Sequence, residues 1–192
     1  MVTNKDEYYI REILNGDPGS FSHLVEKYKD LAFHVSLKIL LNREEAEEAA
    51  QDAFIKAYRA LPSFKGGAAF KTWFYRIVYN NAISRLRSSQ NKKDISLEDV
   101  RISDREVEET ETALGRLSSE ERQRYLQEAL NKMNPEDRSL LMMFYFDELS
   151  VAEITEITSM TESNVKVKLH RGRKKLFELL KGILKDEIIS IL

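Results

Sequence analysis

Apolar residues recur along most of the chain at spacings of three and four, which is the period of an amphipathic α-helix. One stripe follows Asp17, a helix-capping residue type with a proline directly after it. A second stripe follows Asn42, where Glu45 completes the spacing of a capping box, and Pro62 ends it. A third occupies residues 70–86. No strand-like alternation of useful length interrupts these stripes, so the pattern predicts an all-α fold.

Helical periodicity returns in the last third of the chain. Asn134 and the proline after it end one predicted helix and cap the next. Ser150, with a glutamate three residues on, starts a short helix, and a turn at residues 159–161 leads to a final one. The final apolar stripe includes Gly172, which costs about 1 kcal/mol of helix propensity, so we expect it to let another helix pack closely. A short helix, a tight turn and a basic helix predict a helix-turn-helix.

Residues 89–120 lack sustained periodicity, are acidic and contain Ser, Thr and a glycine. This composition is typical of a flexible linker, here with short helical pieces. The chain is therefore predicted to form two small helical domains, residues 1–88 and 121–192, joined by a flexible acidic linker. The C-terminal domain is the one that contains the helix-turn-helix.

The charge of the chain is segregated along the sequence. The 192 residues include 30 Lys and Arg against 32 Asp and Glu, and the net charge of −2 by itself argues against a nucleic-acid binder. However, residues 53–93 hold nine cations and no acid, residues 94–111 hold eight acids, and residues 163–185 hold eight cations and one acid. Two basic blocks around an acidic one predict two anion-binding surfaces. The alternative is that these charged residues simply lie on the solvated faces of ordinary helices.

Several classes of function are disfavoured by what the sequence lacks. Without cysteine it has no disulfide, thiolate nucleophile or cysteine metal site. A Gly-rich phosphate loop, a zinc-protease motif and a Gly-x-Ser-x-Gly motif are also missing, so we expect neither an enzyme nor a bound cofactor or metal. No apolar run reaches the roughly 18 residues of a membrane span, and the chain starts with polar residues. We expect a cytoplasmic protein without membrane insertion.

The outward face of the final predicted helix is basic. In a helix-turn-helix, the first residues of the second helix enter the major groove, while other cations hold phosphates. The residues expected at base edges are Ser163, Asn164, Lys166 and Val167. His170 shares this outward face, and the cations expected on phosphates are Lys168, Arg171, Arg173, Lys174 and Lys175. The alternative is a solvated basic helix in a bundle.

Cations and aromatic residues alternate at the start of the third predicted helix, which follows a glycine-containing loop. Exposed aromatic rings beside cations suit unpaired bases, because a stacked base contributes about 1–3 kcal/mol whatever its identity. We expect Lys71, Tyr75, Arg76, Tyr79 and Asn80 on the side away from the apolar stripe. Packing in the core is the alternative for these rings, and for Trp73 the two interpretations are equally favoured.

Acidic residues line the second predicted helix opposite its alanine stripe. The positive end of the helix dipole accounts for Glu44 and Glu45 but not for Glu48 and Asp52. Such a face suits a basic surface on a partner protein. A metal or acid–base site is less favoured, because no histidine lies close in sequence.

Three segments, in this order, resemble a bacterial sigma factor of the extracytoplasmic-function (ECF) type, a short two-domain class of the sigma-70 family. Residues 42–61 are similar to the helix of that family that binds core RNA polymerase. Residues 70–83 resemble its promoter-melting and −10 helix, and residues 150–176 its −35 helix-turn-helix. The chain departs from the family at Ser159 and Ser84, where glycine and aspartate are frequent.

The resemblance implies roles for individual residues. Contacts to the β′ clamp helices of core polymerase fall on or behind Glu45, Glu48, Gln51, Asp52, Phe54 and Tyr58. The melted −10 strand and a flipped base meet Phe64, Lys65, Lys71, Trp73, Tyr75, Arg76 and Asn80, and the −35 duplex meets the outward residues of the final helix. Residues 142–148 lie near the β flap, and the linker near the RNA exit path. Many members are held by an anti-sigma factor, which makes such a protein a candidate partner.

The resemblance thus implies a sigma-2-like domain in residues 1–88 and a sigma-4-like domain in residues 121–192. The chain is predicted to direct core RNA polymerase to specific promoters and to aid promoter melting. The alternative is a stand-alone helix-turn-helix regulator whose N-terminal domain binds a signal or a partner. Such a domain would not need an acid-free block with aromatic residues, so this block favours the sigma factor. An adaptor that docks on polymerase without reading DNA is disfavoured by the second basic helix.

Overall fold

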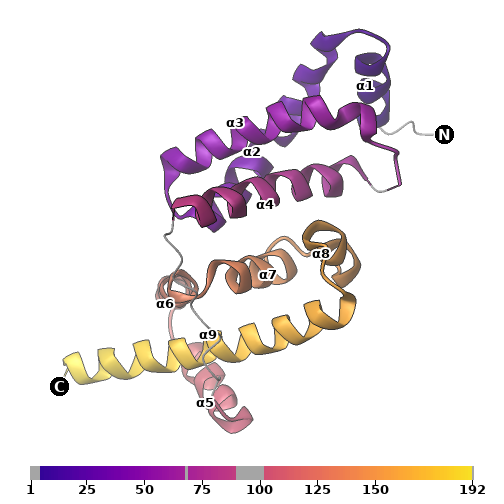
Figure 1. Cartoon of the computed structure of the whole chain (residues 1–192). Coiled ribbons are helices and arrows are strands. Elements are labelled where there is room, and N and C mark those ends of the chain that lie inside the picture. The colour runs from indigo at the N-terminus through magenta and orange to yellow at the C-terminus, as the bar shows by residue number, and fades with distance from the viewer. Residues whose placement is uncertain (1–4, 68, 90–101, 192) are drawn as a thin grey trace. The chain divides into compact units, whose positions relative to one another are not determined.

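The computed structural model describes residues 5–67, 69–89 and 102–191, and every regular element in these ranges is a helix (Figure 1). This confirms the all-α prediction. The elements are α1 (Lys5–Leu14), the 3₁₀ turn η1 (Pro18–Ser20), α2 (Phe21–Leu40), α3 (Arg43–Ala60), the 3₁₀ turn η2 (Leu61–Ser63), α4 (Phe70–Ser89), α5 (Asp104–Gly115), α6 (Ser119–Lys132), α7 (Pro135–Tyr145), α8 (Val151–Thr158) and α9 (Glu162–Ile191). Within the described part of the chain, no helix is long and apolar enough to span a membrane.

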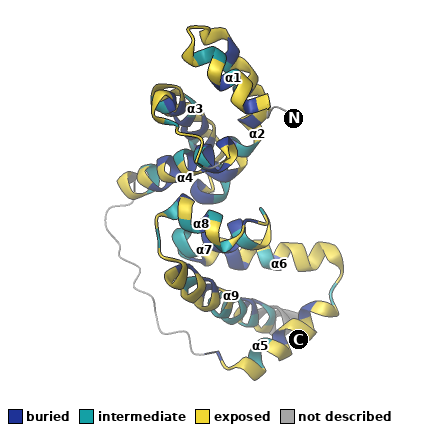
Figure 2. Ribbon diagram, turned by 90° about the vertical axis from the view of Figure 1, so that its right-hand side faces the viewer, coloured by how far each residue is buried: buried dark blue, intermediate teal, exposed yellow. Residues whose placement is uncertain are grey.

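The helices form two compact units: one is built on α1 to α4 and also includes residues 152–160, which hold most of α8, and the other is built on α5, α6, α7 and α9. In the first unit α2, α3 and α4 pack against one another, and their buried residues line the sides that face each other (Figure 2). The buried side of α3 consists of alanines, which let the neighbouring helices approach closely. Phe74 of α4 is fully buried, with its ring centroid 4.7 Å from that of Phe54 and 5.9 Å from that of Tyr28.

The predicted helix starts of the first unit are confirmed by their caps. The Asp17 carboxylate accepts a hydrogen bond from the Gly19 N–H at 3.0 Å and caps η1, which leads directly into α2. The Asn42 side chain accepts one from the Glu45 N–H, also at 3.0 Å, and caps α3. These bonds satisfy N–H groups that have no partner within the helix.

The helix α1 had not been predicted, and a buried carboxylate fastens it to α2. Asp6 is buried and accepts hydrogen bonds from the Tyr28 hydroxyl at 2.6 Å and from the Lys27 ammonium at 2.5 Å. Burial and this carboxylate raise the pKa of Tyr28, so its hydroxyl remains a donor. The pair holds α1 against the start of the bundle.

In the second unit α6 and α7 pack on α9. An ideal Cβ on Gly172 would lie 3.5 Å from the Leu141 side chain of α7, an ordinary contact distance. Gly172 therefore lies at the contact between α9 and α7, but an alanine would also fit there, and the expected need for glycine is not met. Further along α9, Leu180 is fully buried and forms a cluster with Tyr125 and Ala129 of α6, and Leu179 packs against this cluster while only partly buried.

The structure is more regular than predicted in the second half of the expected linker. Residues 104–115 form α5, which packs on α9, and α6 begins at Ser119, before the predicted domain start at residue 121. Capping boxes at Ser103 and Ser118 start these two helices. The short helical pieces expected within residues 89–120 are thus present in this half, where α5 is docked on α9. Residues 90–101 lie outside the described part of the chain.

Candidate nucleic-acid and polymerase-binding surfaces

Only residues 159–161 separate the end of α8 from the start of α9. Ser159 takes a left-handed backbone conformation, with φ of 61°, and its N–H donates to the Thr155 carbonyl at 2.9 Å. Thr161 then caps α9, because its side-chain oxygen accepts a hydrogen bond from the Asn164 N–H at 3.3 Å. Val165, the first residue of the predicted apolar stripe, is fully buried. The serine therefore adopts the left-handed conformation that favours glycine.

Replacing Ser159 with glycine should stabilise this turn. A non-glycine residue in the left-handed region costs about 1–2 kcal/mol, which glycine would avoid. Glycine also increases the conformational entropy of the unfolded chain, and this offsets part of the stabilisation. We expect Ser159→Gly to raise the free energy of unfolding by about 0.5–1 kcal/mol in chemical denaturation. Ser159→Ala removes the same hydroxyl but keeps a Cβ, so it should show no gain. Equal stability of the two variants would contradict strain at this residue.

The structure brings most of the predicted −35 residues to one exposed face of α9. Ser163, Asn164, Lys166, His170, Arg171 and Arg173 are exposed, and so is Val167, an apolar residue with 45% of its surface accessible. Lys166 forms an ion pair with Glu162 at 2.6 Å, one turn earlier on α9. The exposed methyl groups of Val167 fit the thymine contact expected for it.

Other predicted phosphate ligands are already engaged by acids of this unit. Lys168 is less exposed than expected and lies 3.4 Å from the Asp137 carboxylate of α7. Lys174 and Arg173 form ion pairs with acids of α5, and Lys175 with Glu178 at 2.9 Å. Among the residues described, Arg171 forms no ion pair, which makes it the most available of these cations.

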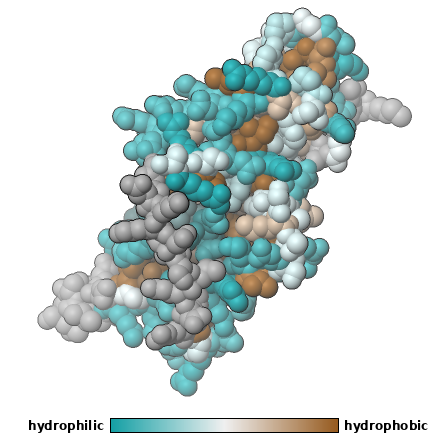
Figure 3. All heavy atoms as spheres, viewed as in Figure 1, coloured by the Kyte–Doolittle hydropathy of each residue, from teal (hydrophilic) through white to brown (hydrophobic). Residues whose placement is uncertain are grey.

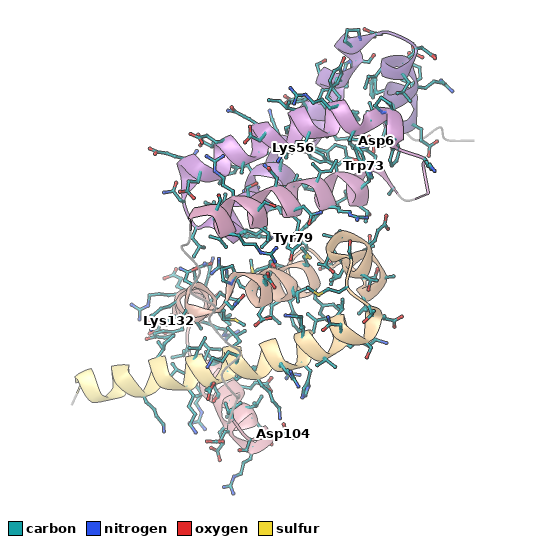
Figure 4. All side chains as sticks on the ribbon, in the orientation of Figure 1. Asp6, Lys56, Trp73, Tyr79, Asp104 and Lys132 are labelled. Atoms are coloured by element: carbon teal, nitrogen blue, oxygen red, sulfur yellow. The ribbon has the colours of Figure 1, made fainter. Side chains whose placement is uncertain are left out.

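Aromatic rings cluster where the loop after α3 meets the start of α4. The Trp73 ring centroid lies 5.1 Å from that of Phe64 and 5.5 Å from that of Phe70, and Figure 4 labels Trp73 at this end of α4. Phe70 is buried, whereas Phe64 and Trp73 are half-buried. Trp73 thus packs on this cluster and keeps part of its ring accessible. Its position agrees with core packing for one part of the ring and leaves the other part open to a base.

Polar residues that flank this cluster in the sequence are exposed, while two tyrosines depart from expectation. Lys65, Lys71, Arg76 and Asn80 are exposed, as a surface for single-stranded DNA requires. Tyr75 and Tyr79 were expected on the exposed side of α4 but are only 4% and 5% accessible. The surface on α4 is therefore built mainly of cations, with accessible aromatic area at Phe64 and Trp73.

The outer face of α3 combines acids with apolar side chains. Glu48, Gln51, Asp52 and Tyr58 are exposed, and Glu45 and Phe54 are half-buried. Phe54 packs on Phe74, so it supports this face from behind. Figure 3 shows hydrophobic patches between the hydrophilic residues of the first unit.

Two further residues of this face were not anticipated. Ile55, a large apolar residue, lies between the predicted contacts with 51% of its surface exposed. Arg85 of α4 forms ion pairs with Glu48 and with Asp52, the latter at 3.5 Å. Arg85 therefore does not belong to the DNA-facing cations of the acid-free block. It neutralises and positions the acids of α3.

Two family models match the chain in the order that the fold suggests. Sigma-70 region 2 matches residues 24–92, which include α3 and α4, and sigma-70 region 4 matches residues 123–176. The ECF RNA polymerase sigma factor SigW of Bacillus subtilis is 34% identical over 187 residues, covering 91% of this chain and 96% of that protein. The chain belongs to the ECF family of RNA polymerase sigma factors. The RNA polymerase sigma-H factor of Pseudomonas aeruginosa is 31% identical and covers 97% of the chain and 99% of its own length.

Solved structures support the fold of this sigma factor. CnrH in complex with the cytosolic domain of CnrY has a TM-score of 0.64 at 18% identity, covering 93% of this chain and 99% of that one. The sigma factor RpoE of Bartonella quintana, solved with the anti-sigma factor NepR, has a TM-score of 0.60 at 21% identity, covering 84% and 96%. The family assignment confirms the predicted sigma factor over a stand-alone helix-turn-helix regulator.

Proposed function

We propose that this sigma factor uses three separate surfaces: the outer face of α3 for core polymerase, the start of α4 for the melted −10 strand, and the outward face of α9 for the −35 duplex. The observation on which this rests most is the segregation of exposed groups. Acids with apolar residues cover α3, cations with accessible rings surround the start of α4, and polar and basic residues cover α9.

The outward face of α9 offers the chemistry that the major groove requires. Asn164 has a donor and an acceptor suited to adenine, Lys166 has a donor suited to guanine, and Val167 an apolar tip suited to thymine. Arg171 can hold a phosphate and so fix the helix along the duplex. These assignments support a −35 role for the domain that we place at residues 121–192.

At the start of α4 the proposed task is to trap unpaired bases. Extruding a base costs a few kcal/mol, and stacking on an aromatic side chain contributes about 1–3 kcal/mol per base. The accessible parts of Phe64 and Trp73 provide such surfaces. Lys71 and Arg76 are exposed residues on either side of Trp73 in the sequence of α4, and we assign them to the neighbouring phosphates. Strand opening then follows from binding the open form more tightly than the duplex.

The acidic and apolar face of α3 suits a basic, partly apolar surface on polymerase, for which we propose the β′ clamp helices. Residues 142–148 are the proposed contact with the β flap, and two large side chains there, Tyr145 and Phe146, are 53% and 57% exposed. An anti-sigma factor is a further proposed partner. RpoE, which shares the fold, was solved with such a protein.

In vitro transcription tests the proposal as a whole. Core RNA polymerase is incubated with a fragmented genomic library, with and without the full chain, and transcript starts are mapped. The chain should create starts that are absent with core polymerase alone and that share sequence elements near −10 and −35. If the added protein produces no new starts, the proposed division into promoter-binding surfaces fails.

A further inference from the structure

The acidic helix α5 lies against the basic side of α9, the helix proposed to bind the −35 duplex. Glu111 forms an ion pair with Arg173 at 2.6 Å, and Asp104 with Lys174 at 2.8 Å. Glu106 forms a third with Lys181 further along α9. Asp104 is labelled on α5 in Figure 4. All these residues belong to one compact unit, so the contacts are internal to the C-terminal domain.

Two of the three cations are ones that the proposed function assigns to DNA phosphates. Arg173 and Lys174 follow the base-reading turns of α9, and each has its charged group directed to a carboxylate of α5. A guanidinium or ammonium group binds carboxylate and phosphate oxygens through the same N–H donors. The acids of α5 and a DNA backbone therefore compete for these side chains.

The docking of α5 does not depend on its acids alone. Leu114, near the C-terminal end of α5, is buried in a cluster with Tyr125, Leu180 and Ile183. The Arg122 guanidinium of α6 donates to the Leu114 carbonyl at 3.2 Å. This apolar anchor keeps the acids of α5 beside α9. Because the acids and the cations belong to the same chain, the acids compete with DNA for these cations at a high effective concentration.

The acids also remain charged over the pH range in which DNA binds. The Lys181 ammonium, together with hydrogen bonds from Ser103, lowers the pKa of Glu106 to about 2. Lys174 likewise lowers the pKa of Asp104 below its ordinary value. Asp104 and Glu106 are thus ionised at neutral pH, as their pairing with the lysines of α9 requires.

We propose that α5 is a built-in competitor for DNA: its carboxylates occupy the phosphate-binding cations Arg173 and Lys174 and so lower the duplex affinity of the free sigma factor. This inference rests on the proposed −35 role of α9. It assigns a regulatory function to a segment outside both regions matched by the family models, since α5 lies between residues 92 and 123. Full use of the basic face requires α5 to release these cations.

The test compares two variants of the full chain that have equal net charge. Asp104→Asn/Glu111→Gln removes both competing carboxylates. Glu109→Gln/Glu120→Gln is the matched control, because Glu109 pairs with Arg105 of α5 itself, at 3.0 Å, and Glu120 is exposed on α6. The probe is a fluorescent 24-base-pair duplex pool of random sequence, because phosphate contacts do not depend on sequence. Binding is measured by anisotropy across a salt series.

We expect the first variant to bind the duplex about tenfold more tightly than the control at low salt, as two exposed ion pairs allow. Its plot of log affinity against log salt should be steeper by nearly 2, because each phosphate contact contributes about 0.9. Equal affinities of the two variants would overturn the inference but leave the −35 role intact. If none of the proteins, wild type included, bound duplex at low salt, the −35 role would fail as well.

Hydrogen exchange of the wild-type chain provides a second measurement that needs no substitution. Saturating duplex should increase exchange of the α5 backbone amides that precede the apolar anchor at Leu114, since DNA displaces the acids that hold this part of the helix on α9. Unchanged protection of α5 in the complex would show that DNA binds with the helix still docked. That result would overturn the proposal even if the double variant proved too unstable to study.

Discussion

Replacing Lys71 with glutamate should abolish promoter opening while leaving −35 binding nearly intact. Lys71 is exposed at the start of α4, beside the ring cluster of Phe64, Phe70 and Trp73, and it forms no ion pair with any residue that the structure describes. Losing a charge-assisted contact to a phosphate costs about 1.5–3 kcal/mol, and the new carboxylate adds repulsion. We expect opening to fall by about 10- to 100-fold or more.

The measurement uses a promoter recovered by the transcription experiment. Permanganate reactivity of unpaired thymines in the holoenzyme complex reports opening, and protection of the −35 duplex reports binding by α9. Lys29→Glu is the matched control, since it reverses the charge of an exposed lysine on α2 whose only described partner is Glu26 of the same helix. Equal loss of opening and −35 protection in the Lys71 variant would contradict the proposed division of labour.

The helices that sequence reasoning predicted correctly are those whose starts depend on neighbouring residues alone. Asp17, Asn42 and Asn134 each accept a hydrogen bond from a backbone N–H two or three positions later. Such caps form whenever the chain turns into a helix, so they can be recognised without knowledge of the tertiary structure. The same holds for the outward face of α9, because helical periodicity alone places its residues on one side.

Short helical pieces were expected in this segment, but the bounds of α5 were not predicted because its own pattern is weak. Few of its residues are apolar, and a helix of this length needs packing partners for its stability. Leu114 and Thr110 become buried only through the rest of the unit. A local signal did exist, since Ser103 and Glu106 form a capping box whose spacing is visible in the sequence. This spacing marks the start of the helix in the sequence, whereas the acidic composition hides it.

Contacts between helices account for the remaining differences. Periodicity put Tyr75 outside the main apolar stripe of α4 but did not show how far packing extends around that helix. Similarly, the sequence showed Arg85 only as a member of the acid-free basic block, whereas its partners Glu48 and Asp52 lie on α3. Pairs between residues more than thirty positions apart follow no short-range spacing. They had to be read from the structure.

The exposed isoleucine of α3 should be among the most sensitive residues for polymerase binding. Ile55 shares the outer face of this helix with Asp52 and Tyr58, and half of its surface is accessible in the free protein. Burying such a side chain against a partner contributes about 1.5–3 kcal/mol, and an aspartate there would place an unpaired charge in the interface. Ile55→Asp should therefore weaken binding to core polymerase by about 100-fold.

Binding is measured by biolayer interferometry with immobilised core polymerase. The matched control is Leu14→Asp, which places the same charge at a leucine of α1 that is 49% exposed, outside the proposed contact surface. Both side chains are accessible, so both variants should unfold within about 0.5 kcal/mol of the wild type. The control should bind polymerase normally. If the two variants bound equally well, the outer face of α3 would not be the polymerase contact, and the residue roles proposed for this helix would have to be withdrawn.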